Sequence, residues 1–381
     1  MINADMERYA KEVQKDLKQL IRDLAPIPAP SHHEDLRVEF LVKYLKNLGA
    51  EGVFVDEAKN VIWPFNVTED NDLVVIMAHT DVVFPDTTPL PFSEDEKYFY
   101  CPGVGDDTAR LATLLMTARY FAERSIRPKT GILFVANSCE EGLGNLKGCR
   151  QLFKTYGSRI KELISNDGAL GNETHHAVGS HRYRISVTTP GGHSWGAFGK
   201  ANAIYELSDL LHDLYQIQVP VREDTKTTFN VGLISGGTSV NTIAQNAECL
   251  YEYRSSEREF LAYMKAKFEE TVERHQREDV KFTVELLGER PCNGDVDPEK
   301  LNALIHRIED SAKRINGLTL KHGKGSTDAN IPLSLGVPAV TIGTCISDGT
   351  HTRQEKLDLS SLYPGTRYFL DVVSYYFETK A

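Results

Sequence analysis

Apolar and polar positions follow two periods along the first third of the chain, one typical of helices and one of strands. A helical period covers residues 6–24, and a capping box at Ser31-His32-His33-Glu34 predicts a second helix that runs to residue 48. Further helices are expected at residues 108–124 and 146–156, and strands at residues 52–55, 61–65, 73–78, 131–136 and 162–165. This alternation predicts an α/β fold in which helices cover both faces of a mostly parallel sheet, with ligands bound at the carboxyl ends of its strands.

The pattern changes after residue 179 and changes back near residue 298. Between these points it predicts strand, helix, strand, strand, helix and strand, which is the order of a ferredoxin-like α+β domain. These elements are expected at residues 182–189, 201–216, 227–234, 247–254, 258–275 and 280–287, and the first pattern resumes with helices at 301–314 and 360–377 and a strand at 339–342. We therefore expect one domain from residues 1–180 and 291–381, with residues 181–290 inserted into it.

Five short segments place a carboxylate or an imidazole after an apolar run. They contain His79 and Asp81, Asp106 and Asp107, Glu140 and Glu141, Asp167, and His351. Taken singly, each has an ordinary structural explanation, such as a helix N-cap, a solvated turn or a strand-end histidine bonded to a nearby aspartate. Together they predict a two-metal hydrolytic site, because such groups are costly to bury unpaired and are the ligands that divalent ions take.

Composition and charge exclude several classes of partner. The chain has 381 residues, a formal net charge of −11 and no basic run, which argues against nucleic acid or an anionic membrane as a partner. Its longest apolar stretches are strand-sized, and the first 22 residues lack the apolar core of a signal peptide. Six scattered cysteines fit reduced thiols, so we expect a cytoplasmic protein. Cys139 could be read as a nucleophile, but no histidine has a spacing that suggests its partner.

The metal motifs, in this order, resemble those of the co-catalytic zinc peptidase family that includes peptidase T, carboxypeptidase G, aminoacylase and succinyl-diaminopimelate desuccinylase. The likeness covers essentially the whole chain. It implies that His79 and Asp167 bind one ion, that Glu141 and His351 bind a second, and that Asp106 bridges both, often from a cis peptide bond to Asp107. Glu140 would be the general base and Asp81 the outer partner of His79. Two Zn²⁺ ions are favoured, and Co²⁺ or Mn²⁺ stay open.

The same resemblance gives the inserted domain a role as a lid and dimerisation domain. His193, in the turn Pro190-Gly191-Gly192-His193-Ser194, would stabilise the oxyanion in the active site of a homodimer partner. Further residues are candidates for holding a substrate carboxylate: Asn241 and Arg254 first, and more weakly Arg290, Ser326 and Asn330.

The chain departs from the family's pattern at two places. Thr108-Ala109-Arg110 replaces the usual basic residue and glycine, a change that is not expected to touch a ligand. Trp195 and Phe198 stand where small residues and a proline are usual, and we expect them to reshape the substrate pocket. Four histidines outside any motif are expected to be solvated loop residues: His32, His33, His175 and His176.

The leading hypothesis is an enzyme that hydrolyses an amide bond in short peptides, most like a peptidase T-type di- or tripeptidase. An N-acyl amino acid deacylase or a desuccinylase with the same site is the enzymatic alternative. A metal-free binding protein on the same fold is the non-enzymatic one, although Glu140 would then have no purpose.

Overall fold

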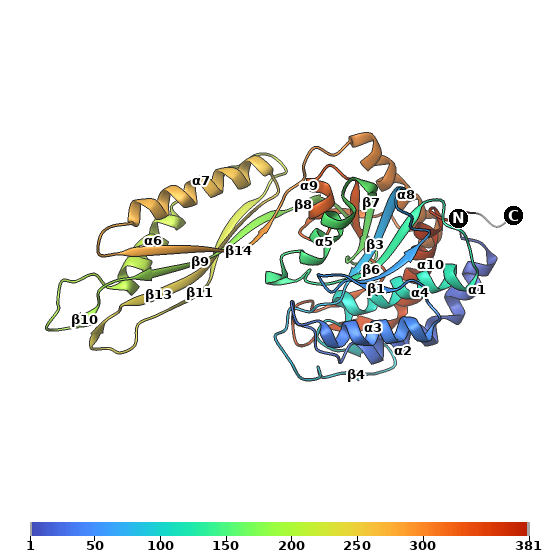
Figure 1. The fold of residues 1–381 in the computed structure, drawn as a ribbon, viewed down its shortest axis with the longest axis horizontal. Helices are drawn as coiled ribbons and strands as arrows, with labels where there is room; N and C mark the ends of the chain where they lie inside the picture. Colours follow the sequence, from blue (N-terminus) through green and yellow to red (C-terminus); the bar gives the residue numbers. More distant parts are fainter. Residues whose placement is uncertain (1, 379–381) are drawn as a thin grey trace. The chain divides into compact units, whose positions relative to one another are not determined.

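The computed structural model describes residues 2–378, which form two compact units (Figure 1). Of the described residues, 2–177 and 294–378 make up one unit, and Val178–Asn293 make up the other. Each has its own hydrophobic core. No helix among residues 2–378 is both long and apolar enough to cross a membrane.

An eight-stranded sheet runs through the first unit, in the order β1-β2-β6-β3-β7-β16-β8-β15. The pairs β3–β6, β3–β7, β7–β16 and β8–β15 are parallel, which confirms the mostly parallel sheet. The strands are β1 (Phe54–Val55), β2 (Val61–Phe65), β3 (Leu73–His79), β6 (Gly131–Asn137), β7 (Ile160–Asn166), β8 (Asn172–Ala177), β15 (Lys321–Gly325) and β16 (Ala339–Ile342).

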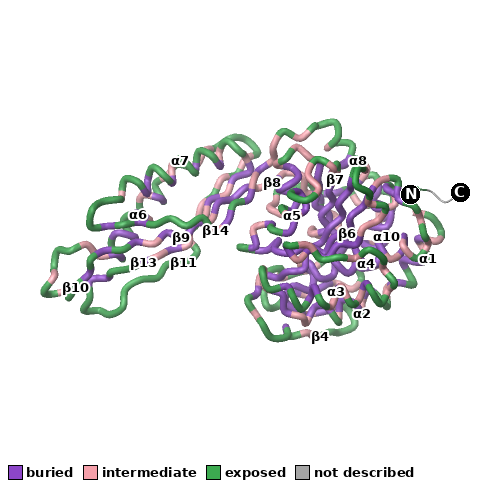
Figure 2. Tube along the Cα trace, viewed as in Figure 1, coloured by how far each residue is buried: buried purple, intermediate pink, exposed green. Residues whose placement is uncertain are grey.

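Helices cover both faces of this sheet, as the alternation of strands and helices predicts. On β3, Val74 and Ile76 belong to one core and Val75 and Met77 to the other, because successive side chains point to opposite faces. The central strands are buried along most of their length (Figure 2). The first core includes residues of α1 (Ala4–Glu12), α2 (Gln14–Leu24), α3 (Asp35–Asn47), α4 (Arg110–Glu123), α8 (Pro298–Asn316) and α10 (Leu362–Ser374), and the second includes residues of α5 (Lys147–Tyr156) and α9 (Asn330–Ser334).

A smaller antiparallel sheet within the first unit pairs the C-terminal part of the chain with residues 93–100. Its strands are β4 (Ser93–Glu94), β5 (Tyr98–Tyr100), β17 (Ser347–Asp348) and β18 (Lys356–Asp358), in the order β17-β18-β5-β4. The connection between β17 and β18 carries His351, and β5 leads into the loop that carries Asp106.

Several sequence predictions for the first unit are wrong. The expected helix over residues 6–24 is two helices that meet at Val13. The capping box does not form: α3 begins at Asp35, and the Glu34 carboxylate instead accepts the backbone N–H groups of His32 at 3.0 Å and Cys139 at 3.1 Å. Strands β8 and β15 were not expected at all, and His175 and His176 lie half-buried on β8 and not in a solvated loop.

The second unit has the predicted ferredoxin-like order. Its antiparallel sheet runs β11-β13-β9-β14, and alternate residues of β9, such as Ile185 and Val187, lie in a core with helices α6 and α7 (Figure 1). The elements are β9 (Gly179–Thr188), α6 (Ala203–Tyr215), β11 (Thr227–Gly236), β13 (Asn246–Ser255), α7 (Arg258–His275) and β14 (Lys281–Arg290), with a short ribbon of β10 (Gly192–His193) and β12 (Thr242–Ile243).

Candidate two-metal site

The five residues proposed as metal ligands converge at one edge of the first unit. They come from the carboxyl ends of parallel strands and from two loops: His79 ends β3, Glu141 follows β6, Asp167 follows β7, Asp106 precedes α4, and His351 lies between β17 and β18. The carboxyl ends of neighbouring parallel strands lie side by side, so residues distant in sequence become neighbours.

Asp106 lies between two imidazoles. Its Oδ1 is 3.1 Å from Nε2 of His79, and its Oδ2 is 3.2 Å from Nε2 of His351. Each imidazole also faces a second carboxylate, since His79 Nε2 is 3.7 Å from Asp167 Oδ1 and His351 Nε2 is 3.1 Å from Glu141 Oε1. Two groups of potential ligands therefore share one aspartate, and the atoms of each lie within 4.8 Å of one another.

The charges of this cluster fit a cation. Carboxylates outnumber imidazoles, and hydrogen bonds with Asp106 and Glu141 raise the pKa of His351 to about 10. Burial alone would lower the pKa of His79, yet the nearby carboxylates of Asp107 and Asp106 raise it well above its ordinary value. The imidazoles thus hold protons at the positions where a divalent ion would place its charge, and ion binding would release those protons. The nitrogen and oxygen donors suit Zn²⁺, Co²⁺ or Mn²⁺.

Asp81 organises the residues around His79. Nδ1 of His79 lies 3.0 Å from the carbonyl oxygen of Asp81, so Nδ1 keeps its hydrogen and Nε2 is the nitrogen that would give up its proton to an ion. The Asp81 carboxylate accepts the Ser31 hydroxyl at 2.6 Å and the backbone N–H groups of Glu140 at 3.0 Å and Glu141 at 2.9 Å. Burial opposes ionisation, but the bonds from His79 and Ser31 hold the pKa of Asp81 below its ordinary value.

Glu355 supports the loop that carries Asp106, and the sequence analysis missed it. Its buried carboxylate accepts backbone N–H groups from Gly103 at 2.7 Å, Gly105 at 3.0 Å and Asp106 at 2.9 Å. This loop packs tightly against Ser347. A Cβ atom added to Gly105 would lie only 2.2 Å from Cβ of Ser347. The peptide bond between Asp106 and Asp107 is cis.

Arg110 reaches a proposed ligand, so the expectation that this departure from the family's pattern touches none is wrong. Its buried guanidinium lies 3.3 Å from Asp107 Oδ1 and 3.8 Å from Asp106 Oδ1. It also donates to the carbonyl oxygens of Gly105 at 2.7 Å and Gly168 at 2.6 Å. Arg110 thereby ties together the loops that carry Asp106 and Asp167.

Glu140 is buried beside the cluster, and an oxygen of its side chain groups with His79 and Glu141 within 4.8 Å. One amide and one further carboxylate lie near the same strand ends: Asn137 and Asp328. Asn137 donates to Asp328 Oδ2 at 2.6 Å, and burial raises the pKa of Asp328 to about 7. Asp328 was not identified from the sequence, where it lies between the two candidates Ser326 and Asn330.

Asn330 and Ser326 belong to the first unit. Asn330 is buried, and its side-chain oxygen accepts the backbone N–H of Thr327 at 2.9 Å, while Ser326 is half-buried. Their proposed role toward a substrate stays a prediction.

The other sequence candidates lie in the second unit, where His193 and Asn241 are neighbours. The backbone N–H of Ser194 donates to the Asn241 carbonyl at 3.0 Å. His193 is exposed, and its Nδ1 accepts the N–H groups of Trp195 at 3.2 Å and Gly196 at 3.3 Å, so its hydrogen is on Nε2. Trp195 and Phe198 are 89% and 92% exposed.

Three arginines gather on the sheet of this unit. Arg254 and Arg290 both pair with Ser180 of the central strand β9, and Arg182 lies two residues further along it. Arg254 donates to both carboxylate oxygens of Glu252, at 3.0 and 3.1 Å, and Arg182 donates to Glu252 at 3.3 Å. Burial and the charges of Arg290 and Arg254 lower the pKa of Arg182.

Cys139 has a histidine beside it that its spacing in the sequence does not suggest. Its Sγ lies 3.4 Å from Nδ1 of His32 and 3.1 Å from Glu34 Oε1. Burial and the Glu34 carboxylate raise the pKa of the Cys139 thiol to about 12, which opposes the thiolate that a nucleophile needs.

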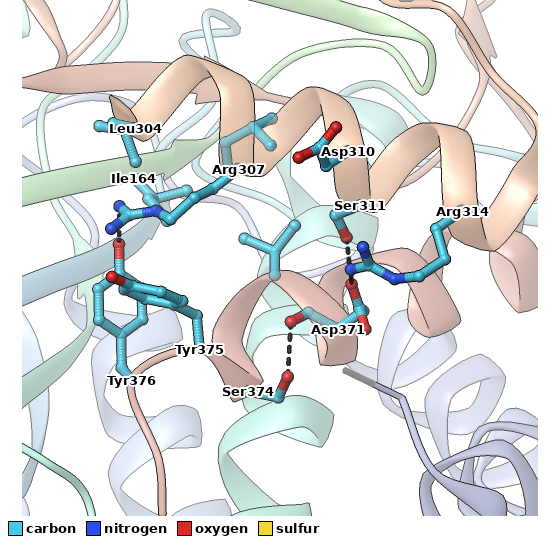
Figure 3. Close-up of a pocket in the computed structure, with 12 residues that line it drawn as sticks. Ile164, Leu304, Arg307, Asp310, Ser311, Arg314, Asp371, Ser374, Tyr375 and Tyr376 are labelled. Atoms are coloured by element: carbon cyan, nitrogen blue, oxygen red, sulfur yellow. Dashed lines mark hydrogen bonds and ion pairs between the residues drawn. The ribbon is translucent and has the colours of Figure 1, made fainter. Parts of the chain in front are cut away.

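Two cavities lie elsewhere in the first unit, away from the proposed ligands. One, of about 850 Å³, is lined by the first residues of β3 and β7. The other lies between α8 and α10 (Figure 3), where Arg307 donates to the hydroxyl of Tyr376 at 3.2 Å and Arg314 pairs with Asp371. No proposed ligand lines either cavity.

Comparison with known proteins places this arrangement in context. The sequence model of peptidase family M20/M25/M40 matches residues 75–375. The chain is 25% identical over 368 residues to the uncharacterised protein YqjE of Bacillus subtilis (strain 168), covering 92% of this chain and 95% of that protein. It is 26% identical over 312 residues to the succinyl-diaminopimelate desuccinylase of Bordetella bronchiseptica, covering 77% and 80%. The crystal structure of aminopeptidase PepT from Bacillus cereus ATCC 10987 shares its fold, with a TM-score of 0.71, 22% identity and coverage of 94% and 98%.

Proposed function

The chain belongs to peptidase family M20/M25/M40 and is a hydrolase, and we propose that it cleaves an amide bond in short peptides, as a di- or tripeptidase of the peptidase T type. The observation that carries this proposal is the position of Asp106 between the two imidazoles, each of which faces a further carboxylate. In this proposal His79 and Asp167 would hold one ion, Glu141 and His351 would hold the other, and Asp106 would be a ligand of both.

When bound, two such ions supply Lewis acidity, which polarises the scissile carbonyl and makes water a nucleophile near neutral pH. The chain's own part begins with Glu140, which is a neighbour of the ligands and is not counted among them. Its carboxylate accepts the proton of the attacking water and passes it to the nitrogen of the leaving amine. Asp81 fixes the backbone of Glu140 and orients His79, so base and ligand keep a constant relative position.

His193 is proposed to donate a hydrogen bond to the oxyanion that forms as water attacks. Two observations support this role. Its Nδ1 already accepts two backbone N–H groups, and Nε2 is therefore a donor on an exposed side chain. We propose that it acts in the site of a second copy of the chain.

The proposed homodimer forms through the inserted unit. Strand β11 is an edge strand, and most of its residues are exposed. Edge strands present unpaired backbone groups to another chain. Large apolar side chains are exposed on this unit as well, among them Trp195, Phe198, Tyr205, Ile234 and Val240. A second copy would cover such surface, since exposed apolar patches mark interaction sites. A cytoplasmic location fits the six buried free cysteines.

The substrate is proposed to carry a carboxylate that Arg254, Arg290 and Asn241 recognise, with Ser326 and Asn330 as further contacts. Three clustered arginines also favour one form of the second candidate, a desuccinylase, because a succinyl group adds a second carboxylate.

One screen tests the proposal and separates the candidates. Protein reconstituted with Zn²⁺, Co²⁺ or Mn²⁺ is assayed against dipeptides, tripeptides, N-acetyl amino acids and N-succinyl amino acids. We expect the highest kcat/KM for a di- or tripeptide and no turnover with the Glu140→Gln variant. Preference for N-succinyl substrates would favour the second candidate. Absence of hydrolysis by metal-loaded protein would favour a binding protein.

A further inference from the structure

A second cluster of potential metal ligands lies at the edge of the large sheet, away from the residues described above. Glu173 and His175 lie on β8, and His322 lies on the edge strand β15, directly opposite Glu173 in the parallel register. Potential ligand atoms of the three residues lie within 4.8 Å of one another. The Glu173 side chain is fully buried, whereas His175 and His322 are 30% and 48% exposed.

The carboxylate of Glu173 lies between the two imidazoles. Nδ1 of His175 is 2.9 Å from Glu173 Oε2 and 3.0 Å from Oε1, and Nδ1 of His322 is 2.9 Å from Oε2. The two rings are 5.8 Å apart between centroids, at an angle of 73°. Ligand atoms placed about 2.0–2.1 Å from a tetrahedral ion lie about 3.3 Å from each other, so these atoms need to move little to bind one.

His322 also has the outer partner that a metal-bound histidine usually has. Its second nitrogen, Nε2, lies 3.1 Å from Glu309 Oε1 on α8. A neutral imidazole donates through one nitrogen only, so His322 facing two carboxylates must carry either an extra proton or an ion. Histidines that bind metal commonly donate their other N–H to a carboxylate in this way.

We propose that Glu173, His175 and His322 bind a divalent ion such as Zn²⁺, with Glu309 orienting His322. Water or a further side chain completes the coordination.

The ion would fasten β15 to the sheet. Strand β15 reads Lys321-His322-Gly323-Lys324-Gly325, four of its residues are exposed, and it has no apolar side chain to bury. Its neighbour β8 is the strand from which the chain passes into the second unit at Val178. A link between Glu173 and His322 would hold these two strands together where packing contributes little.

Counting bound metal tests the proposal. The full-length enzyme is equilibrated with buffered micromolar free Zn²⁺, and zinc per chain is measured for wild type, His322→Ala, and His306→Ala as the matched control. His306 is an exposed histidine on the same helix as Glu309. We expect His322→Ala to bind one ion fewer than wild type and His306→Ala to bind the same number. Peptide hydrolysis should be unchanged in both.

A second variant tests the same ion with a substitution that is less disruptive to the fold. Glu309→Gln keeps the size of the side chain and should weaken binding of this one ion by about 10–100-fold. The expected difference of one ion does not depend on how many ions the Asp106 site holds, so failure of the proposed function would leave it standing. Equal zinc content in wild type and folded His322→Ala would overturn the proposal.

Discussion

The carboxylate of Glu355 accepts the backbone N–H of Asp106 at 2.9 Å. This bond joins the segment that follows His351 to the loop that holds the proposed bridging ligand, so two parts of the site that are far apart in sequence are positioned together. Two more N–H groups of that loop, from Gly103 and Gly105, bind the same carboxylate.

Replacement of Glu355 should therefore disturb metal binding without removing a ligand. We expect Glu355→Ala to destabilise the protein by about 1–3 kcal/mol, because buried donors lose their acceptor, and to bind metal more weakly at the Asp106 site. Denaturant unfolding and zinc titration measure both effects. As a control, Glu355→Gln retains one acceptor oxygen and should fall between alanine and wild type. Unchanged metal affinity in Glu355→Ala would show that the loop keeps its conformation without Glu355.

The Glu140→Gln variant separates catalysis from metal binding. An amide preserves the shape of the side chain but cannot accept the proton of water, so kcat should fall by about 10²–10⁴-fold while metal content stays the same. Steady-state kinetics and elemental analysis of one preparation give both numbers. Near-normal kcat in the metal-loaded variant would remove Glu140 from the mechanism.

Activity should depend on the second ion at the Asp106 site. Protein that carries His322→Ala, and therefore lacks the proposed site at Glu173, His175 and His322, is stripped by a chelator and titrated with Zn²⁺. We expect full activity only at two ions per chain, because the ligands divide into two groups around Asp106. His351→Ala should lose one ion and most of its turnover. Full turnover with one ion would contradict the two-metal proposal.

Action of His193 in a partner's site has a distinct signature. His193→Ala should lower kcat by about 10²–10³-fold with metal content unchanged, as loss of an oxyanion donor does. Mixing inactive His193→Ala chains with inactive Glu140→Gln chains should then restore some activity, because one site of a mixed dimer receives both intact groups. Each variant mixed with itself is the control. If mixed dimers verified by mass spectrometry stay inactive, His193 does not act in trans.

Strand ends were the predictable part of the site. His79 and Glu141 follow strongly apolar runs, Asp167 follows a shorter one, and a parallel sheet brings such strand ends together whatever their separation in sequence. Strands β8 and β15 could not be found in this way, because Asn172–Ala177 and Lys321–Gly325 are polar and lie near the sheet's edge. Their position depends on pairing partners that the pattern does not reveal.

The residues that position the proposed ligands could not be predicted from the apolar pattern either. Ser31 was expected to cap a helix, and its hydroxyl instead binds Asp81, a choice that depends on tertiary structure. Glu355 and Arg110 act on backbone groups of distant loops, which no local period records. The division between α1 and α2 at Val13 was missed for a related reason. Buried positions continue through the junction at Ala10, Val13 and Leu17, so the apolar pattern shows no interruption.

Asp81 receives the Ser31 hydroxyl and the backbone of Glu140 and Glu141, and it also faces His79. Groups that bind the same carboxylate do not contribute independently to the free energy of unfolding, so mutations among them are non-additive. Once Asp81 is replaced, a further substitution at Ser31 should cost little. A double-mutant cycle on this pair would therefore show a large coupling energy. The effect of a substitution at Ser31 would therefore depend on which residue occupies position 81.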